Sequence, residues 1–468
     1  MQEFLQACAA AIGAQYVLTS PADMASYLAD RRGRFTGAAL AVVRPGSAEE
    51  TAAIVALCHQ FRVPLVPQGG NTGLVLGSVP DTSGTAIVLS LMRLNRIRAI
   101  DTINHTMTVE AGCILQHIQQ AAAEAGLLFP LALAAQGSCT IGGNLATNAG
   151  GTGVLRYGNT RELCLGLEII TAQGTLISNL RGLRKDNTGY DLRHLFIGAE
   201  GTLGVISAAV LKLFPQPKAQ VTALVAVATP EAALQLLGQA QQACDASLTA
   251  FELISDYCLQ LVERHFPALH SPFQTRYPYL VLLEISDNES TEHANGLLEQ
   301  VIGAALDQGL AADAAIASSI AQSAALWALR EHISDAQARE GKNIKHDISM
   351  PISSIPEFMR DTDALLQQHF PGCAMVTFGH LGDGNLHYNV SPSADLPGDA
   401  LLDSQPQINR IVYDSVDRFG GSISAEHGLG ALKREEIRRY KPAAELQLMA
   451  TIKQALDPLN LMNPGKVL

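Results

Sequence analysis

The sequence lacks the patterns that mark several large classes of protein. Its eight cysteines are scattered without a CxxC pair, so neither a disulfide framework nor a thiolate metal cluster is indicated. Lys and Arg number 32 against 44 Asp and Glu, and no basic run is present that could follow a nucleic-acid backbone. No apolar stretch reaches the ~18 residues of a membrane span. The N-terminal MQEFLQACAAAIGAQYVLTS has no basic region, so we expect an amphipathic helix rather than a secretory signal, and a cytoplasmic protein with reduced thiols.

What is present indicates more than one domain. A chain of 468 residues, 47 % of them hydrophobic, has material for two or three packed cores. From about residue 36 to 218, short β-rich runs alternate with Gly-rich loops and a helix-like run over 187–199; beyond 218, Ala- and Gln-rich helical segments alternate with strand-like runs. We predict an α+β fold with an N-terminal helical segment (1–35), a first domain (36–218), a sheet-and-helix second domain (219–420) and a C-terminal segment (421–468) containing the helix AAELQLMATIKQAL.

Two glycine-rich segments, PQGGNTGLVLGS (67–78) and QGSCTIGGNLATNAGG (136–151), are candidates for a phosphate cradle. Without a Cβ, consecutive backbone N–H groups can approach a pyrophosphate closely. No GxxxxGK[ST] is present, and Gly151-Thr152-Gly153 lacks the third glycine of a Rossmann fingerprint. Ordinary turn-rich loops remain the alternative for either segment alone. Together with GAEGTLGVI (198–206), the segments favour cofactor binding.

The stretch GHLGDGNLHYN (379–389) predicts a β-hairpin with Asp383-Gly384 at its tip. In that register His380 faces His387 with Cβ atoms ~5 Å apart, so that both imidazoles can bind one metal ion. A carboxylate from SAEHGLG, Glu426, completes the His2Glu set that is typical of catalytic zinc sites. Two surface or core histidines are the alternative. Phosphate binding is the weaker interpretation, because nothing cationic lies in the loop.

The segment LREHISDAQAREGKNIKHD contains a candidate carboxylate site. Arg330 and Ser334 are four residues apart and share a face if the segment is one helix, and Lys345 follows on the next expected strand. A solvated helix face is the alternative that the residues by themselves favour.

With LRYGN and LRKDNTGYDL, the glycine-rich segments resemble the FAD-binding domain of the vanillyl-alcohol oxidase and p-cresol methylhydroxylase superfamily. The resemblance implies a two-subdomain FAD-binding domain, an α/β cap domain with an antiparallel sheet, and a C-terminal helical segment. Some relatives attach FAD through a histidine in the first loop, whereas this chain has Asn71 and Thr72 there, so noncovalent FAD is implied. The implied FAD-binding residues are Pro67, Gln68, Gly69, Gly70, Asn71, Thr72, Gly73, Leu74, Ser78, Gly137, Ser138, Thr140, Ile141, Gly142, Gly143, Asn144, Thr147, Asn148, Gly151, Tyr157, Gly158, Glu200, Gly201, Gly204, Val205, Ile206 and Asn463.

A second resemblance covers nearly the whole chain from about residue 36. WALREHISDAQAREGKNIKHDISMP, GHLGDGNLHYNV, SAEHGLG and NPGKVL resemble the FAD-dependent D-2-hydroxyacid dehydrogenases, and among them most closely the D-2-hydroxyglutarate dehydrogenases. It implies that His380, His387 and Glu426 bind a divalent metal, usually Zn2+, with Mn2+ and Fe2+ suited to the same ligands. It also implies that His427 is the catalytic base and that the substrate is bound by Arg330, Ser334, Lys345, Asn389 and His427.

The activity implied is oxidation of D-2-hydroxyglutarate to 2-oxoglutarate, and of D-malate as a second diacid, with hydride transfer from C2 to flavin N5. Lys345 beside Arg330 favours a substrate with a second carboxylate. A D-lactate dehydrogenase and the flavin subunit of a glycolate oxidase are the alternatives among enzymes, and a flavoprotein subunit without turnover is the alternative of another class. In place of catalysis, His427 has the alternative role of orienting Glu426. The relatives imply electron-transferring flavoprotein or a quinone as electron acceptor, and a homodimer.

Overall fold

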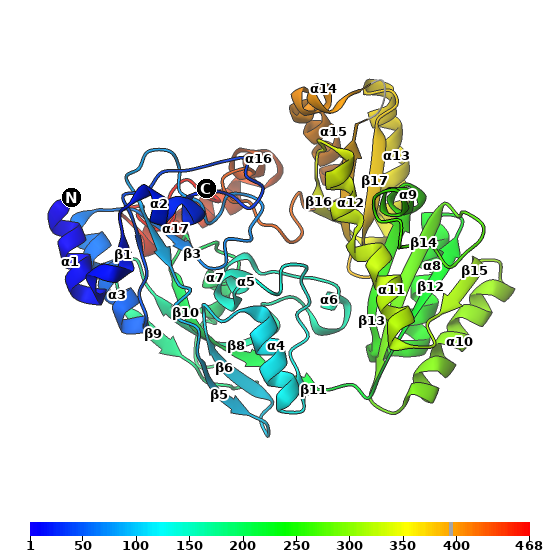
Figure 1. The fold of residues 1–468 in the computed structure, drawn as a ribbon, viewed down its shortest axis with the longest axis horizontal. Helices are drawn as coiled ribbons and strands as arrows, with labels where there is room; N and C mark the ends of the chain where they lie inside the picture. The colour runs from blue at the N-terminus through cyan, green and yellow to red at the C-terminus, as the bar shows by residue number, and fades with distance from the viewer. Residues whose placement is uncertain (393–395) are drawn as a thin grey trace. The chain divides into compact units, whose positions relative to one another are not determined.

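The computed structural model describes residues 1–392 and 396–468, which form two units of interleaved sequence (Figure 1). The first unit comprises Met1–Gly150, Gly158–Gln216 and Glu426–Leu468, and the second comprises Gly151–Tyr157 and Pro217–Ala425. Helices and largely antiparallel sheets occur in both, so the predicted α+β class is confirmed. Within the described ranges, no helix is long and apolar enough to cross a membrane.

The first unit contains a four-stranded sheet of order β1-β2-β4-β3. Its strands are β1 (Val17–Leu18), β2 (Ala41–Val43), β4 (Ile87–Ser90) and β3 (Leu65–Gln68), and β4 is parallel to both β2 and β3. β2 and β4 are buried throughout, as expected for short apolar runs in a parallel arrangement. The accompanying helices are α1 (Gln2–Ile12), α2 (Pro21–Leu28) and α3 (Ala48–Phe61).

A second, antiparallel sheet in this unit has the order β5-β6-β10-β8-β9. Its strands are β5 (Ile97–Asp101), β6 (Thr106–Glu110), β10 (Val205–Lys212), β8 (Cys164–Ile170) and β9 (Leu176–Asn179). Arg98 bridges two buried carboxylates, those of Glu110 at 3.2 Å and Glu168 at 3.0 Å. The remaining elements are α4 (Leu115–Glu124), β7 (Leu127–Leu128), α5 (Ile141–Thr147), α7 (Arg193–Phe196), β11 (Phe214–Pro215), α16 (Arg434–Tyr440) and α17 (Ala443–Leu456).

Two helix predictions in this unit differ in outcome. The C-terminal helix spans Ala443–Leu456, as the sequence predicts. The helix-like run over 187–199 was too long, because only Arg193–Phe196 is helical. Gly189 at φ +133° and Gly198 at φ +82° adopt backbone conformations that do not continue a right-handed helix.

The second unit is built on a seven-stranded antiparallel sheet of order β15-β12-β14-β13-β17-β18-β16. Its strands are β12 (Ala219–Val227), β13 (Leu248–Ser255), β14 (Tyr279–Asp287), β15 (Ala311–Ile316), β16 (Asp347–Ser349), β17 (Ala374–His380) and β18 (Asn385–Ser391). The helices are α6 (Val154–Tyr157), α8 (Pro230–Cys244), α9 (Asp256–His265), α10 (Thr291–Asp307), α11 (Ile320–Glu331), α12 (Ile333–Glu340), α13 (Ile355–His369), α14 (Gly398–Asp403) and α15 (Gln405–Arg418).

Helices cover both faces of this sheet. On one face, Leu224, Ile254 and Phe378 pack into an apolar cluster with side chains of α9, α11 and α12. α8 and α10 contact the same strands and belong to the opposite face (Figure 1). Because successive residues of a strand point to opposite faces, Glu252 and His380 share the face of Ile254 and Phe378.

A half-buried acid, Asp363 of α13, makes the stability of the second unit depend on pH. Burial raises its pKa to about 6, although its hydrogen bond from the Tyr388 hydroxyl opposes the shift. Since the pKa of Asp363 in the folded state lies above its ordinary value, the contribution of this carboxyl to folding stability is complete at low pH. That contribution is lost as the pH rises through 6. We expect the free energy of unfolding of Asp363→Asn, relative to that of wild type, to rise by about 1 kcal/mol from pH 5 to pH 8. Urea unfolding followed by the single tryptophan, Trp327 of α11, measures this, and an unchanged difference between the two pH values would contradict it.

Candidate functional site

The first glycine-rich loop follows directly on β3 and lies against the second loop. A Cβ on Gly70 would stand 1.9 Å from the carbonyl oxygen of Ser138, and one on Gly69 would stand 2.2 Å from Thr140 Oγ1. Glycine is therefore required at position 70 by the close approach of two backbones, and at position 69 by the Thr140 side chain. Asn71 adopts φ +52°. Two hydrogen bonds hold its side chain in place: Nδ2 donates to Ala29 O, and Oδ1 accepts from Ser78 Oγ.

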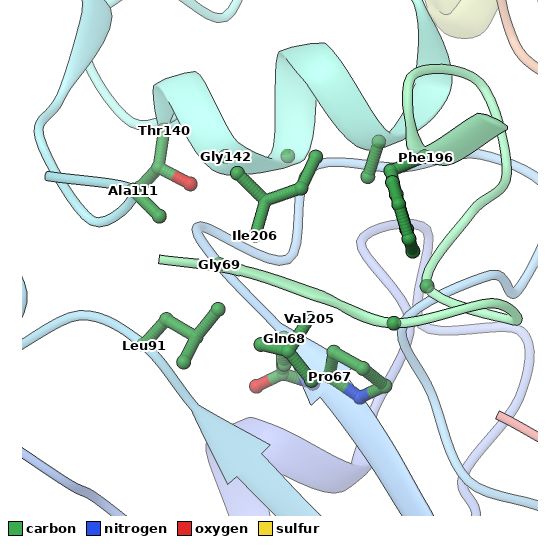
Figure 2. A pocket seen from close by; sticks show the side chains of 14 residues that line it. Pro67, Gln68, Gly69, Leu91, Ala111, Thr140, Gly142, Phe196, Val205 and Ile206 are labelled. Carbon is green, nitrogen blue, oxygen red and sulfur yellow. The ribbon is translucent and has the colours of Figure 1, made fainter. Parts of the chain in front are cut away.

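These loops line two adjoining pockets in the first unit, and the larger has about 710 Å³ of space, part of it open to solvent. Figure 2 shows the smaller one, with Leu91, Phe196 and Ile206 along its walls and the Thr140 hydroxyl among them. Of the predicted cofactor residues, those lining a pocket are Pro67, Gln68, Gly69, Gly70, Asn71, Thr72, Gly73, Ser78, Thr140, Gly142, Gly143, Asn144, Thr147, Glu200, Gly201, Gly204, Val205 and Ile206.

The other predicted cofactor residues lie outside these walls: Leu74, Gly137, Ser138, Ile141, Asn148, Gly151, Tyr157, Gly158 and Asn463. Gly151 and Tyr157 belong to the second unit. Asn463 links two loops, because its Nδ2 donates to the carbonyl oxygens of Gly77 and Glu200.

The pocket walls contain polar groups that suit a bound nucleotide. Thr140 Oγ1 and Asn144 Nδ2 are buried and have no hydrogen-bond partner among the described residues. A buried donor or acceptor without a partner is costly, so a ligand that supplies hydrogen bonds is expected here. The close-packed glycine loops together with these two side chains fit the pyrophosphate and polar groups of FAD.

Glu200 fixes a turn that carries a candidate base into the larger pocket. Its carboxylate accepts hydrogen bonds from the backbone N–H groups of Leu429, at 2.7 Å, and Gly430, at 2.9 Å. Burial raises the pKa of Glu200, and these two hydrogen bonds oppose the shift. The turn directly follows His427, which lines the same pocket. Glu200 was predicted to bind the cofactor, and its hydrogen bonds to this turn were not predicted.

The predicted hairpin is present, but its predicted register was wrong. His387 lies opposite Phe378, and the strands are joined by the residues between His380 and Asn385 rather than by a two-residue turn. Gly379, at φ +152°, and the Asp383 carboxylate, which accepts from Asn385 N, form a wider turn. The slip equals two residues, and side chains alternate with a period of two, so both histidines keep the same face.

His380, His387 and Glu426 offer ligand atoms within 4.8 Å of one another, as the sequence analysis expected of a metal site. The imidazole centroids are 5.8 Å apart, and His380 is buried. Glu426 directly follows Ala425, whose N–H donates to Asp347 O of β16. Two imidazoles and one carboxylate fit Zn2+ and several other divalent ions. Asp347, which pairs with His387 in the sheet and was not singled out from sequence, forms a second such group with Glu426 and His427.

A buried carboxylate that sequence analysis also missed supports this cluster. Glu252 of β13 lies 2.5 Å from His380 Nδ1 and accepts from Arg330 Nε at 2.7 Å. Burial alone would raise the pKa of Glu252, but the charges of His380 and Arg330 lower it to about 2. The signal in the sequence was a Glu inside the apolar run Leu248–Ser255, where an unpaired charge is costly.

The predicted carboxylate-binding residues do not lie on one helix. Arg330 lies in the last turn of α11 and Ser334 in the first turn of α12. The turn at His332 separates the two helices, so the prediction of one shared helix face was wrong. Arg330 is buried, Ser334 is exposed, and Lys345 precedes β16 and is half-buried. Asn389 is also buried, with its amide donating to Gln337 Oε1 and accepting from His346 N.

Family models match most of the chain. One, described as "FAD binding domain", matches residues 39–179, and another, described as "FAD linked oxidases, C-terminal domain", matches residues 216–467. Two proteins named D-2-hydroxyglutarate dehydrogenase are similar over nearly the full length. That of Xanthomonas citri pv. viticola is 40 % identical over 98 % of this chain and 95 % of its own. The mitochondrial protein of Danio rerio is 38 % identical over 96 % and 82 %.

Solved structures show the same fold at low identity. p-Cresol methylhydroxylase with substrate bound has a TM-score of 0.79 at 14 % identity, covering 100 % of this chain and 96 % of that one. An alkyldihydroxyacetonephosphate synthase has a TM-score of 0.75 at 16 % identity, covering 99 % and 84 %. The expected vanillyl-alcohol oxidase type of fold is thereby confirmed.

Proposed function

Because the chain belongs to the FAD-dependent D-2-hydroxyacid dehydrogenases, a group of FAD-linked oxidases, we propose that it oxidises D-2-hydroxyglutarate to 2-oxoglutarate with a bound divalent metal ion. The observation that carries this proposal is the His380, His387 and Glu426 cluster together with the position of the next residue. That residue, His427, lines the glycine-rich cofactor pocket. One dipeptide therefore connects the candidate metal site to the candidate flavin site.

FAD, bound noncovalently by the two glycine-rich loops, supplies the acceptor for the hydride removed from C2. Gly69 and Gly70 allow the loops to approach each other, and Thr140 and Asn144 supply hydrogen-bonding groups to the cofactor. Residues 200–206 contribute Glu200, Gly201, Val205 and Ile206 to the pocket walls. Leu91, Phe196 and Ile206 give this part of the site apolar walls.

A Zn2+ ion held by His380, His387 and Glu426 supplies Lewis acidity toward the C2 hydroxyl and C1 carboxylate of the substrate. His427 is the catalytic base in this proposal. Oxidation of an alcohol to a ketone removes one hydride from carbon and one proton from oxygen, and the imidazole of His427 accepts that proton. His427 lines the pocket formed by the glycine-rich loops, so FAD bound there would share a pocket with the proposed proton acceptor.

Arg330 and Lys345 are the proposed anchors of the substrate carboxylates. Arg330 Nε is bound to Glu252, while its Nη1 and Nη2 have no hydrogen-bond partner among the described residues. A guanidinium oriented in this way can bind a carboxylate through both terminal nitrogens. Lys345 adds a second cation, which favours a dicarboxylate such as D-2-hydroxyglutarate or D-malate over D-lactate. Ser334 and Asn389 provide further polar groups in this proposal.

Electron-transferring flavoprotein or a quinone then reoxidises the flavin.

Anaerobic bleaching of the flavin absorbance at ~450 nm tests this function. We expect D-2-hydroxyglutarate and D-malate to bleach metal-replete protein rapidly, and L-2-hydroxyglutarate, the matched control, to leave the flavin oxidised. Prior treatment with a chelator should abolish bleaching, and added Zn2+ should restore it. Faster bleaching by D-lactate or glycolate would overturn the diacid assignment, and full activity after chelation would overturn the metal.

A further inference from the structure

A charged residue, Glu252, stands in the middle of the buried strand β13, and no step of the proposed reaction uses it. Its side chain is 1 % exposed, yet each carboxylate oxygen has a partner. Oε1 lies 2.5 Å from His380 Nδ1, and Oε2 accepts from Arg330 Nε at 2.7 Å. Burying a carboxylate is costly even when it is paired, and apolar residues in its place are often equally stable. The position of Glu252 therefore calls for an explanation other than stability.

The three residues come from three elements of the second unit. Glu252 of β13 lies directly opposite His380 of β17 in the sheet, whereas Arg330 reaches the same face from α11. The Arg330 guanidinium also lies over the Phe378 ring, 4.7 Å from its centroid. The carboxylate thus links a candidate metal ligand to a candidate substrate anchor across a packed sheet.

The pairing decides which nitrogen of His380 carries a proton. A carboxylate beside a guanidinium is ionised and only accepts hydrogen bonds, so His380 Nδ1 is the donor. Once the ring is neutral, as a metal ligand must be, the proton stays on Nδ1 and the lone pair is on Nε2, the form in which histidine binds a metal. On the other side, the bond to Nε leaves the fork of the Arg330 terminal nitrogens to recognise a carboxylate.

We propose that Glu252 is a positioning residue that holds His380 in its metal-binding tautomer and Arg330 in its carboxylate-binding orientation. The inference rests on the proposed function, because it assigns the same metal and substrate sites. It adds that the two sites are coupled: loss of one carboxylate weakens both metal binding and substrate binding.

The test compares Glu252→Gln with wild type by competition for Zn2+ with a chromogenic chelator, using metal-stripped flavoprotein. We expect zinc affinity to fall by about 10- to 100-fold, as for other carboxylates that orient a ligating histidine. The KM for D-2-hydroxyglutarate should rise in the same variant, and the FAD content should stay unchanged. Glu284→Gln is the matched control, since Glu284 is a mostly buried carboxyl on the adjacent strand β14, bonded to Trp327 and Thr222. It should bind zinc as wild type does.

The outcomes separate this inference from the proposed function. If wild type binds no zinc and His380→Ala oxidises the substrate as wild type does, the proposed metal site is wrong. If wild type binds zinc and Glu252→Gln binds it equally tightly, the positioning role fails and the proposed function stands. Equal losses in Glu252→Gln and Glu284→Gln would also overturn the inference, because they would report a general loss of packing.

A measurement on the wild-type protein covers the case in which Glu252→Gln does not fold. Long-range 1H–15N NMR of labelled histidines in metal-stripped flavoprotein distinguishes the two neutral tautomers. His380→Gln identifies the resonances of His380 by their absence. We expect the proton on Nδ1, and a proton on Nε2 would contradict the positioning role.

Discussion

Replacing His380 and His387 together with alanine is expected to abolish oxidation of D-2-hydroxyglutarate while the protein keeps its FAD. The double substitution removes two of the three ligands of the proposed site, and an ion held instead by Glu426 with Asp347 and His427 would occupy the proposed base. Lewis acidity contributes several kcal/mol to such reactions, so a loss of about 10³-fold or more in kcat/KM is expected. The pockets lined by the glycine-rich loops contain neither histidine, so flavin absorbance should remain.

The measurements are zinc content, flavin absorbance and bleaching by substrate on the same preparation. His270→Ala with His293→Ala is the matched control, since these exposed histidines belong to the same unit and lie outside the candidate metal groups. It should keep zinc, flavin and activity. Loss of FAD from the His380/His387 double variant would show that the metal and flavin sites are not separate. Unchanged activity would remove the metal from the reaction.

Gly70→Ala is expected to yield a protein that no longer retains FAD. The added Cβ would stand 1.9 Å from the carbonyl oxygen of Ser138, and the backbone fixes the positions of both atoms, so no side-chain rotation relieves the clash. The two loops must separate. Overpacking of this kind costs up to about 3 kcal/mol, which corresponds to a ~100-fold weaker affinity for FAD. Gel filtration followed by the ratio of flavin to protein absorbance measures retention, and titration of apoprotein with FAD gives the affinity.

The same loop provides a comparison at Gly73. A Cβ there meets no atom within 4 Å, so Gly73→Ala should leave the loop and the stability of the first unit unchanged. If Gly73→Ala keeps its stability but loses FAD, the cofactor itself approaches Gly73. If Gly70→Ala binds FAD as wild type does, the two loops separate without cost, and close approach is not what requires glycine at that position.

Local signals in the sequence were sufficient for several elements. The run VPLVPQ before the paired glycines became β3 and its loop, and the helix over Ala443–Leu456 has the predicted bounds. His380, His387 and Glu426 were predicted from sequence as metal ligands, and their ligand atoms lie within 4.8 Å of one another even though the hairpin register was wrong. The two histidines are still close together because a shift of two residues in the strand pairing leaves each side chain on the same face of the sheet.

The features that were missed depend on contacts between residues distant in sequence. Glu252 and His380 are 128 residues apart, and only the pairing of β13 with β17 brings them together. Arg330 and Ser334 looked like one helix face because nothing in the local sequence marks the turn at His332. The wider hairpin turn depends on an Asp383 hydrogen bond and on the conformation of Gly379, whereas Asp-Gly by itself favours a two-residue turn.

The interleaving of the two units has a consequence for the order in which they can form during synthesis. The second unit is largely complete once Ala425 has been made, since it needs Gly151–Tyr157 and Pro217–Ala425. The first unit includes residue 1, yet its β3 bridges to Met462, and Asn463 clamps Gly77 and Glu200 beside the flavin pocket. Domains fold as units as the chain emerges. The unit that begins the chain is therefore the last to be finished, and we expect nascent chains shorter than about 460 residues to have a folded second unit and no capacity to retain flavin.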